Sequence, residues 1–281
     1  MKINLAKSAG FCFGVKRAIE IARKIALNNK RVFILGDIVH NEEISQEITS
    51  WGVKKIKNLT RGEGKILLIR AHGAGKEVFR KARKLGYKIV DATCPMVKEI
   101  HKIAKREEKK GRKIIIIGDE NHDEVLGIVG QLEKKTLIID PRRKIDREEL
   151  KGIKKASVVV QSTQNMEEVE KIKGILEKHI KDLRFFNTIC NPTRIKQKEI
   201  KTLPKMNDLV IIIGSKTSAN TKRLYEIASR INRNTYWISN HTELKAEWFK
   251  GVNSVGITAG ASTPERTIKK VIEGIEKISQ A

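Results

Sequence analysis

Cysteine, proline and aromatic residues are scarce in this chain of 281 residues: three cysteines, five prolines and 5% aromatic side chains. Three widely spaced cysteines do not make a disulfide framework, and in a reducing compartment they favour a metal or catalytic role. The few aromatic residues are not interleaved with basic ones, as a groove that stacks nucleic-acid bases requires. The scarcities therefore exclude a disulfide scaffold and argue against a base-stacking groove.

Long apolar runs are also missing. No stretch approaches the roughly 20 apolar residues of a membrane span. The first ten residues, MKINLAKSAG, lack the apolar core of a secretion signal. We therefore expect a cytoplasmic protein with no membrane partner.

Positive charge is abundant instead. The net charge is +25, from 58 Lys and Arg against 33 Asp and Glu. Such a field attracts anions, including nucleic acid and phosphorylated metabolites. A solvated surface rich in Lys and Glu, as in many heat-adapted proteins, accounts for the charge as well. Because charge alone is weak grounds for nucleic-acid binding, we expect no nucleic-acid partner.

A repeat organises the chain. Three apolar runs end in glycine, VFILGD, IIIIGD and VIIIGS, and each glycine lies 24 residues after a cysteine. The pairs are Cys12 and Gly36, Cys94 and Gly118, and Cys190 and Gly214. Three equal spacings within similar patterns indicate three related units.

Each unit alternates helix and strand. Helical segments follow the cysteines at 15–27, 96–109 and, less clearly, 194–202. After the strand that ends in glycine come a helix, a weaker strand, another apolar run with a polar end, and a further helix. The two later strands read VKKIKN and ILLIRAHGAG, then TLIID and SVVVQSTQN, then TYWIS and SVGITAGAST. This alternation predicts mostly parallel sheets.

The third unit lacks the final strand that leads to the next cysteine, and the N-terminal KINLAKSAGFC supplies one. We predict a ring of three small α/β domains related by a pseudo-threefold: 13–94, 95–190, and 191–281 completed by 1–12. Loops after the carboxyl ends of parallel strands form the binding crevice. All three cysteines lie in such loops, so their thiols would converge at the centre.

Three thiolates bind zinc with a fourth ligand, or an iron–sulfur cluster. Structural zinc usually takes cysteines in close pairs, and the chain has no C-x-x-C. A cluster of four irons held by three cysteines leaves one iron open for water or substrate. The alternative is three buried, inert thiols, which their shared positions in the repeat disfavour.

Polar groups at the other strand ends predict a site for phosphate. They are His40, Asn41, His72, His122, Glu124, Gln161, Ser162, Thr163, Asn165, Ser218, Asn220 and Ser262. Helix N-termini and histidines bind phosphate well, and no loop has the glycine spacing of an ATP or NAD site. Glu124 beside His122 is placed to donate a proton, although a first-turn glutamate also stabilises a helix N-terminus.

The motifs that contain these residues resemble those of a known family. GFCFGVKRAI, VHN, AHG, DATCP, NHDEV, GSKTSAN and TAGAS resemble, in order and over the full length, the motifs of the 4-hydroxy-3-methylbut-2-enyl diphosphate reductases. The resemblance implies a trefoil of three α/β domains around a 4Fe–4S cluster, which would be bound by Cys12, Cys94 and Cys190, with the substrate hydroxyl on the open iron. It implies an iron–sulfur oxidoreductase for the last step of the non-mevalonate isoprenoid pathway, which makes isopentenyl and dimethylallyl diphosphates.

The resemblance also implies roles for single residues. Glu124 would pass a proton to the departing hydroxyl, with Ser162 and Thr163 nearby, and two electrons would come from ferredoxin or flavodoxin. The diphosphate would be held by His40, His72, His122, Ser218, Asn220 and Ser262. Ala219 stands where the family commonly has a second serine, and QST replaces QTT at 161–163. We expect a monomer or homodimer without an added RNA-binding domain.

Two other hypotheses stay open on the residues alone. A cluster-dependent dehydratase would use the open iron only as a Lewis acid, and it would consume no electrons. A basic nucleic-acid-binding protein with a structural zinc would contain zinc after purification and bind in a steeply salt-dependent way.

Overall fold

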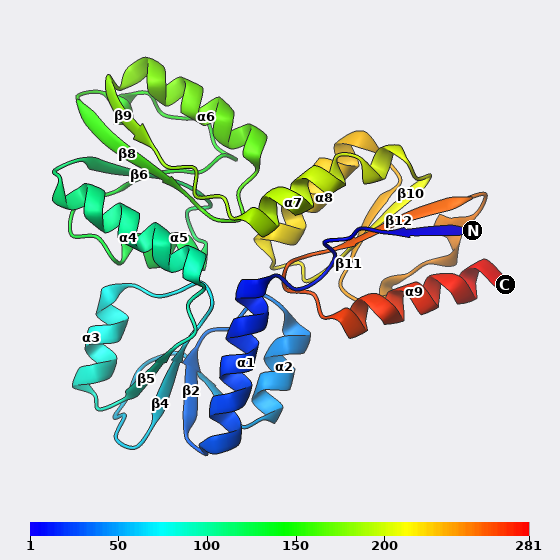
Figure 1. Ribbon diagram of the computed structural model, residues 1–281, viewed down its shortest axis with the longest axis horizontal. Helices are drawn as coiled ribbons and strands as arrows, with labels where there is room; N and C mark the ends of the chain where they lie inside the picture. Colours follow the sequence, from blue (N-terminus) through cyan, green and yellow to red (C-terminus); the bar gives the residue numbers. More distant parts are fainter. Residues whose placement is uncertain (281) are drawn as a thin grey trace. The chain divides into compact units, whose positions relative to one another are not determined.

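The short β-branched runs form strands and the segments between them form helices. The computed structural model describes residues 1–280, in which three four-stranded sheets occur (Figure 1). Every strand pairing in these sheets is parallel. The predicted class, three small α/β domains with parallel sheets, is confirmed.

Sheet A joins the two ends of the chain. Its order is β1-β12-β10-β11, and Lys2 to Leu5 pair with Ser254 to Ile257. Its strands are β1 (Lys2–Leu5), β10 (Leu209–Ile213), β11 (Thr235–Ile238) and β12 (Ser254–Ala259). Its helices are α7 (Asn191–Ile200), α8 (Ala219–Ile231) and α9 (Glu265–Gln280). The N-terminal strand therefore belongs to the sheet built by the C-terminal segment.

Sheets B and C repeat this order when it is read from the opposite edge, with β3-β2-β4-β5 and β7-β6-β8-β9 corresponding to β11-β10-β12-β1. Sheet B contains β2 (Val32–Leu35), β3 (Lys54–Ile56), β4 (Ile66–Ile69) and β5 (Lys88–Asp91), with helices α1 (Phe13–Asn28), α2 (Glu42–Ser50) and α3 (Lys76–Lys84). Sheet C contains β6 (Lys113–Ile117), β7 (Leu137–Ile139), β8 (Lys155–Val160) and β9 (Asp182–Phe185), with α4 (Pro95–Lys109), α5 (Asp123–Val129) and α6 (Met166–His179). Short 3₁₀ helices occur at Glu148–Leu150, Leu203–Lys205, His241–Glu243 and Ala246–Phe249.

The central strands are apolar on both faces because helices cover both. In sheet C, Ile115 and Ile117 pack with residues of α6, whereas Ile114 and Ile116 pack with α4 and α5. Figure 1 shows α4 and α5 on one side of this sheet and α6 on the other. Since successive side chains of a strand point to opposite faces, an unbroken run such as IIII supplies both cores.

The chain forms two compact units. One contains residues 1–15, 40–44 and 191–281 and holds sheet A; the other contains 16–39 and 45–190 and holds sheets B and C. The predicted domain boundaries, 13–94, 95–190 and 191–281 with 1–12, stay a prediction. No helix within residues 1–280 is long and apolar enough to cross a membrane.

Candidate active site

A buried carboxyl group lies at the strand ends of sheet C. Glu124, in the first turn of α5, is 2% exposed. Its Oε1 accepts from the backbone N–H of Ser162 at 2.6 Å, and its Oε2 accepts from the Ser162 hydroxyl at 2.7 Å. The first turn of α5 and the loop after β8 thus meet in one pair of hydrogen bonds.

The surroundings of Glu124 favour its protonated form. Burial raises the pKa of its carboxyl group, the hydrogen bonds from Ser162 lower it, and the charge of Asp119 raises it; the net shift is upward. No cation is among these influences. A carboxyl group whose pKa is raised holds its proton more tightly and is suited to act as a general acid.

The two hydroxyls of the QST motif have different partners. Ser162 binds Glu124, whereas the Thr163 hydroxyl accepts from the Gln161 amide at 3.0 Å. Gln161 in turn accepts from the backbone N–H of Asp119 at 2.8 Å. The structure therefore separates a hydroxyl next to the acid from one that belongs to the loop's internal bonding.

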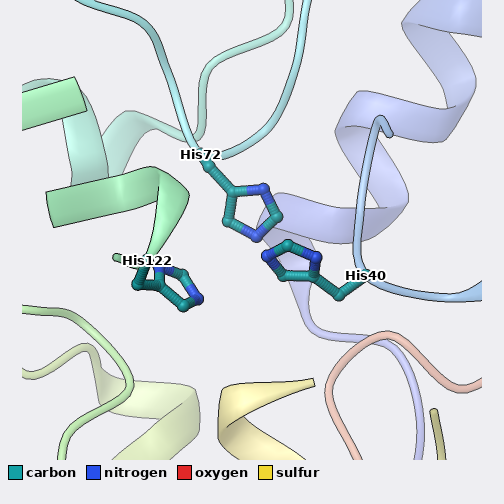
Figure 2. Close-up of side chains that lie close together, drawn as sticks. All are labelled: His40, His72 and His122. Atoms are coloured by element: carbon teal, nitrogen blue, oxygen red, sulfur yellow. The ribbon is translucent and has the colours of Figure 1, made fainter. Parts of the chain in front are cut away.

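Figure 2 shows two histidines of the compact unit that holds sheets B and C. His72 lies in the loop after β4, and His122 lies directly before α5. The rings of His72 and His122 are edge to face, 5.5 Å between centroids. His122 caps α5, because its Nδ1 accepts from the Glu124 N–H at 3.1 Å, which leaves the proton of a neutral ring on Nε2. Arg70 donates to Asp123 at 2.6 Å and joins the same two loops.

The three cysteines lie in equivalent places after the edge strands β1, β5 and β9. All are partly buried and, within residues 1–280, outside any disulfide. In each sheet the cysteine N–H donates to a carbonyl in the loop after the neighbouring strand. The pairs are Cys12 with Ala261 at 3.1 Å, Cys94 with Ala71 at 2.9 Å and Cys190 with Ser162 at 3.1 Å. The sequence repeat is thus also a repeat of hydrogen bonds.

In the sheet A unit, the segment 40–44 is held by the loops around that sheet. The Ser262 hydroxyl donates to the His40 carbonyl at 2.9 Å, and the Ser215 hydroxyl donates to Glu42 at 2.8 Å. Glu43 accepts from Arg266 and from Thr267. Although burial raises it, these donors bring the pKa of Glu43 below its ordinary value.

The start of α8 carries an amide with an unused donor. The Ser218 hydroxyl caps the helix by accepting from the Thr221 N–H at 3.3 Å. Asn220, 6% exposed, has a buried side-chain nitrogen that finds no hydrogen-bond partner among residues 1–280. Ala219 between them is 8% exposed and offers no side-chain donor. A buried donor without an acceptor is costly, and an anionic ligand would satisfy it.

The sequence did not predict the exposure of some residues around the proposed site. Phe13, the residue that follows Cys12 in the GFCFG motif, is 69% exposed. Lys196 on α7 is 2% exposed, although it belongs to none of the sequence motifs. Its spacing gave a signal, since Thr193, Lys196, Gln197 and Ile200 form one buried stripe at helical spacing.

The three parallel sheets share one strand order, and each holds a cysteine by the same kind of backbone hydrogen bond. The protein is therefore an α/β protein built from three related sheets, with its candidate site residues at the ends of the strands. A sequence profile of one family, described as LytB protein, matches residues 3–276. The chain belongs to the LytB family.

Individual relatives agree with this assignment. A protein of Aquifex aeolicus named 4-hydroxy-3-methylbut-2-enyl diphosphate reductase is 39% identical, and the match covers 99% of this chain and 97% of that protein. A solved reductase of the same name, called the terminal enzyme of the non-mevalonate pathway, is 37% identical with a TM-score of 0.72, over 99% of this chain and 100% of the other. The E-1-hydroxy-2-methyl-but-2-enyl-4-diphosphate reductase of Plasmodium falciparum has a TM-score of 0.88 at 28% identity, over 97% and 87%.

Proposed function

We propose that this protein is a 4-hydroxy-3-methylbut-2-enyl diphosphate reductase, the enzyme of the terminal step of the non-mevalonate pathway. Its near full-length similarity to proteins of that name supports the assignment. The observation in the structure that carries the chemistry is the buried Glu124 carboxyl group, which is bonded to Ser162 and has no cationic partner among the residues that the structure describes. That group is a proton donor placed at the carboxyl ends of sheet C.

The reaction balances as a two-electron reduction. The allylic alcohol takes up two electrons and two protons, the C–O bond breaks, and one water leaves. Glu124 gives one proton to the departing hydroxyl, and the second proton goes to the carbon skeleton. Isopentenyl and dimethylallyl diphosphates differ in which carbon receives it.

The cysteines fit an iron–sulfur cluster. All three are soft thiol ligands at equivalent strand ends, partly exposed, and each is fixed by its own backbone hydrogen bond. We propose that Cys12, Cys94 and Cys190 converge to hold a 4Fe–4S cluster, which when bound supplies the two electrons and one open iron for the substrate oxygen. Ferredoxin or flavodoxin in the cytoplasm would deliver the electrons.

The diphosphate would be bound by groups that donate hydrogen bonds. We assign this role to His40, His72, His122, Ser218, Asn220 and Ser262. The Asn220 amide supports the assignment, because a phosphate oxygen would satisfy its buried nitrogen. Between Ser162 and Thr163, the contact with Glu124 favours Ser162 as the hydroxyl that orients the acid.

Anaerobic purification followed by turnover tests this function. We expect iron and sulfide in equal numbers, about four of each per chain as in a 4Fe–4S cluster, and two reducing equivalents consumed per product. Cys12→Ser should lose cluster and reduction together. Stoichiometric zinc without sulfide would exclude the cluster, and product formed without consumption of reductant would instead indicate a dehydratase.

A further inference from the structure

Two side chains of helix α7 bind the loop that leads to Cys12. Lys196 and Glu199 lie one turn apart on this helix, and both bind Ser8, four residues before Cys12. Lys196 Nζ donates to the Ser8 carbonyl, while Glu199 accepts from the Ser8 N–H at 3.1 Å and from the Ser8 hydroxyl. The backbone of Ser8 is therefore held at both its donor and its acceptor.

Lys196 also binds the end of β12. Its Nζ donates to the Ala259 carbonyl at 3.0 Å, and the same carbonyl accepts from the Gly10 N–H at 3.4 Å. Gly10 has φ +90, and a side chain there would press on Ile268. One ammonium group thus joins α7, the strand end of sheet A and the turn that carries Cys12.

A lysine in this position is unusual. The side chain is 2% exposed, and buried ammonium groups are rare unless they are paired with a negative charge. The hydrogen bonds made by its Nζ go to neutral carbonyls. Burial lowers the pKa of Lys196 to about 8, whereas negative charge on Cys12 and on Glu199 raises it.

We propose that Lys196 is a positioning residue: with Glu199 it fixes the Ser8–Cys12 loop, and so it holds Cys12 in place to bind the cluster. This inference rests on the proposed function. Because α7 begins directly after Cys190, the helix that grips the Cys12 loop also continues from a second proposed ligand. The contacts of Lys196 and Glu199 with Ser8, which we call the clamp, therefore connect the Cys12 loop to the helix that starts after Cys190.

The test compares anaerobically reconstituted variants of the full chain. Lys196→Met removes the charge and keeps the apolar stem, Lys196→Arg keeps the charge, and Lys198→Met is the matched control on the exposed face of α7. We expect Lys196→Met to lose iron to a chelator about 10- to 100-fold faster than wild type and to have a lower reduction potential, because a positive charge favours the reduced cluster. Lys196→Arg should restore the potential, and Lys198→Met should match wild type.

Iron release and potential equal to wild type in Lys196→Met would overturn the inference. A wild-type protein that takes up no iron and sulfide would instead overturn the proposed function, so the two failures are distinguishable. If thermal unfolding shows that Lys196→Met does not fold, Glu199→Ala tests the same clamp. That variant frees Ser8 and should also speed iron release, and unchanged release would contradict the clamp.

Discussion

Two glutamates near the proposed site, Glu124 and Glu43, have opposite electrostatic settings. Glu124 is almost fully buried, within residues 1–280 its side chain accepts hydrogen bonds from Ser162 alone, and its pKa is raised. Glu43 is 40% exposed and binds the guanidinium of Arg266 as well as Thr267, and its pKa is lowered. Both carboxyl groups lie in or beside the first turn of a helix, so sequence position does not decide their role. The presence of a cationic partner does.

The largest effect should come from Glu124→Gln. This change keeps the shape of the side chain but removes the proton that we assign to the departing hydroxyl. Turnover should fall by about 10²- to 10⁴-fold, while substrate affinity changes little. Steady-state kinetics with an excess of reductant and a separate binding measurement check both halves, and wild-type turnover would remove the role of Glu124 as acid. Glu43→Gln, with the same chemical change, is the control.

A smaller effect is expected at Asn220. Asn220→Leu replaces the buried amide with an apolar group of similar size, so a diphosphate oxygen loses one donor. We expect substrate binding to weaken about tenfold, which corresponds to roughly 1.4 kcal/mol for a hydrogen bond to a charged group. The folded protein should not lose stability, because the amide nitrogen has no partner to lose within residues 1–280. Unchanged substrate affinity would show that Asn220 does not face the diphosphate.

The segment 40–44 offers a test of similar or smaller size. Thr267→Val removes the hydroxyl that donates to Glu43 and should lower the free energy of unfolding by about 1 kcal/mol. Thermal or urea unfolding measures this, with the exposed Thr242→Val as a control. Equal stability of wild type and Thr267→Val would mean that this bond does not hold the segment.

The pH dependence of stability should differ in sign between the two glutamates. The raised pKa of Glu124 means that the folded state binds its proton more tightly, so its contribution to stability falls as pH rises from the ordinary value of 4.5 through the folded pKa. The lowered pKa of Glu43 makes its contribution complete above 4.5 and lost as pH falls through the folded pKa. Relative to wild type, Glu124→Gln should gain stability with rising pH, and Glu43→Gln should lose it. Parallel pH profiles for the two variants would contradict the comparison.

Much of this structure follows from the sequence. Runs such as IIII at 114–117 predict buried parallel strands because both faces are apolar, and the equal cysteine-to-glycine spacing predicts the repeat. Counting which unit lacks a strand predicts that the N-terminal strand completes the third unit, and Lys2–Leu5 does pair with β12 of that unit. The motif residues also predicted that Glu124 and Ser162 would belong to one site.

The rest depends on contacts between residues far apart in the chain. Nothing local in Glu43 or Thr267 distinguishes them from surface helix residues, and their bond joins positions 224 residues apart. Lysine is a residue type that usually lies at the surface, but Lys196 falls at a helical position where core residues are expected. Only the packing of the folded chain decides between the two. The choice between Ser162 and Thr163 likewise required the positions of Glu124 and Gln161.

The most direct test of the account is the protonation state of Glu124, measured by infrared difference spectroscopy of wild type against Glu124→Gln. We predict a protonated-carboxyl C=O band in the wild type at a pH above the ordinary glutamate value of 4.5, where exposed glutamates are ionised. The band should be absent from Glu124→Gln and retained in Glu43→Gln. A wild-type spectrum at that pH with only carboxylate bands would contradict the assignment of Glu124 as the buried proton donor.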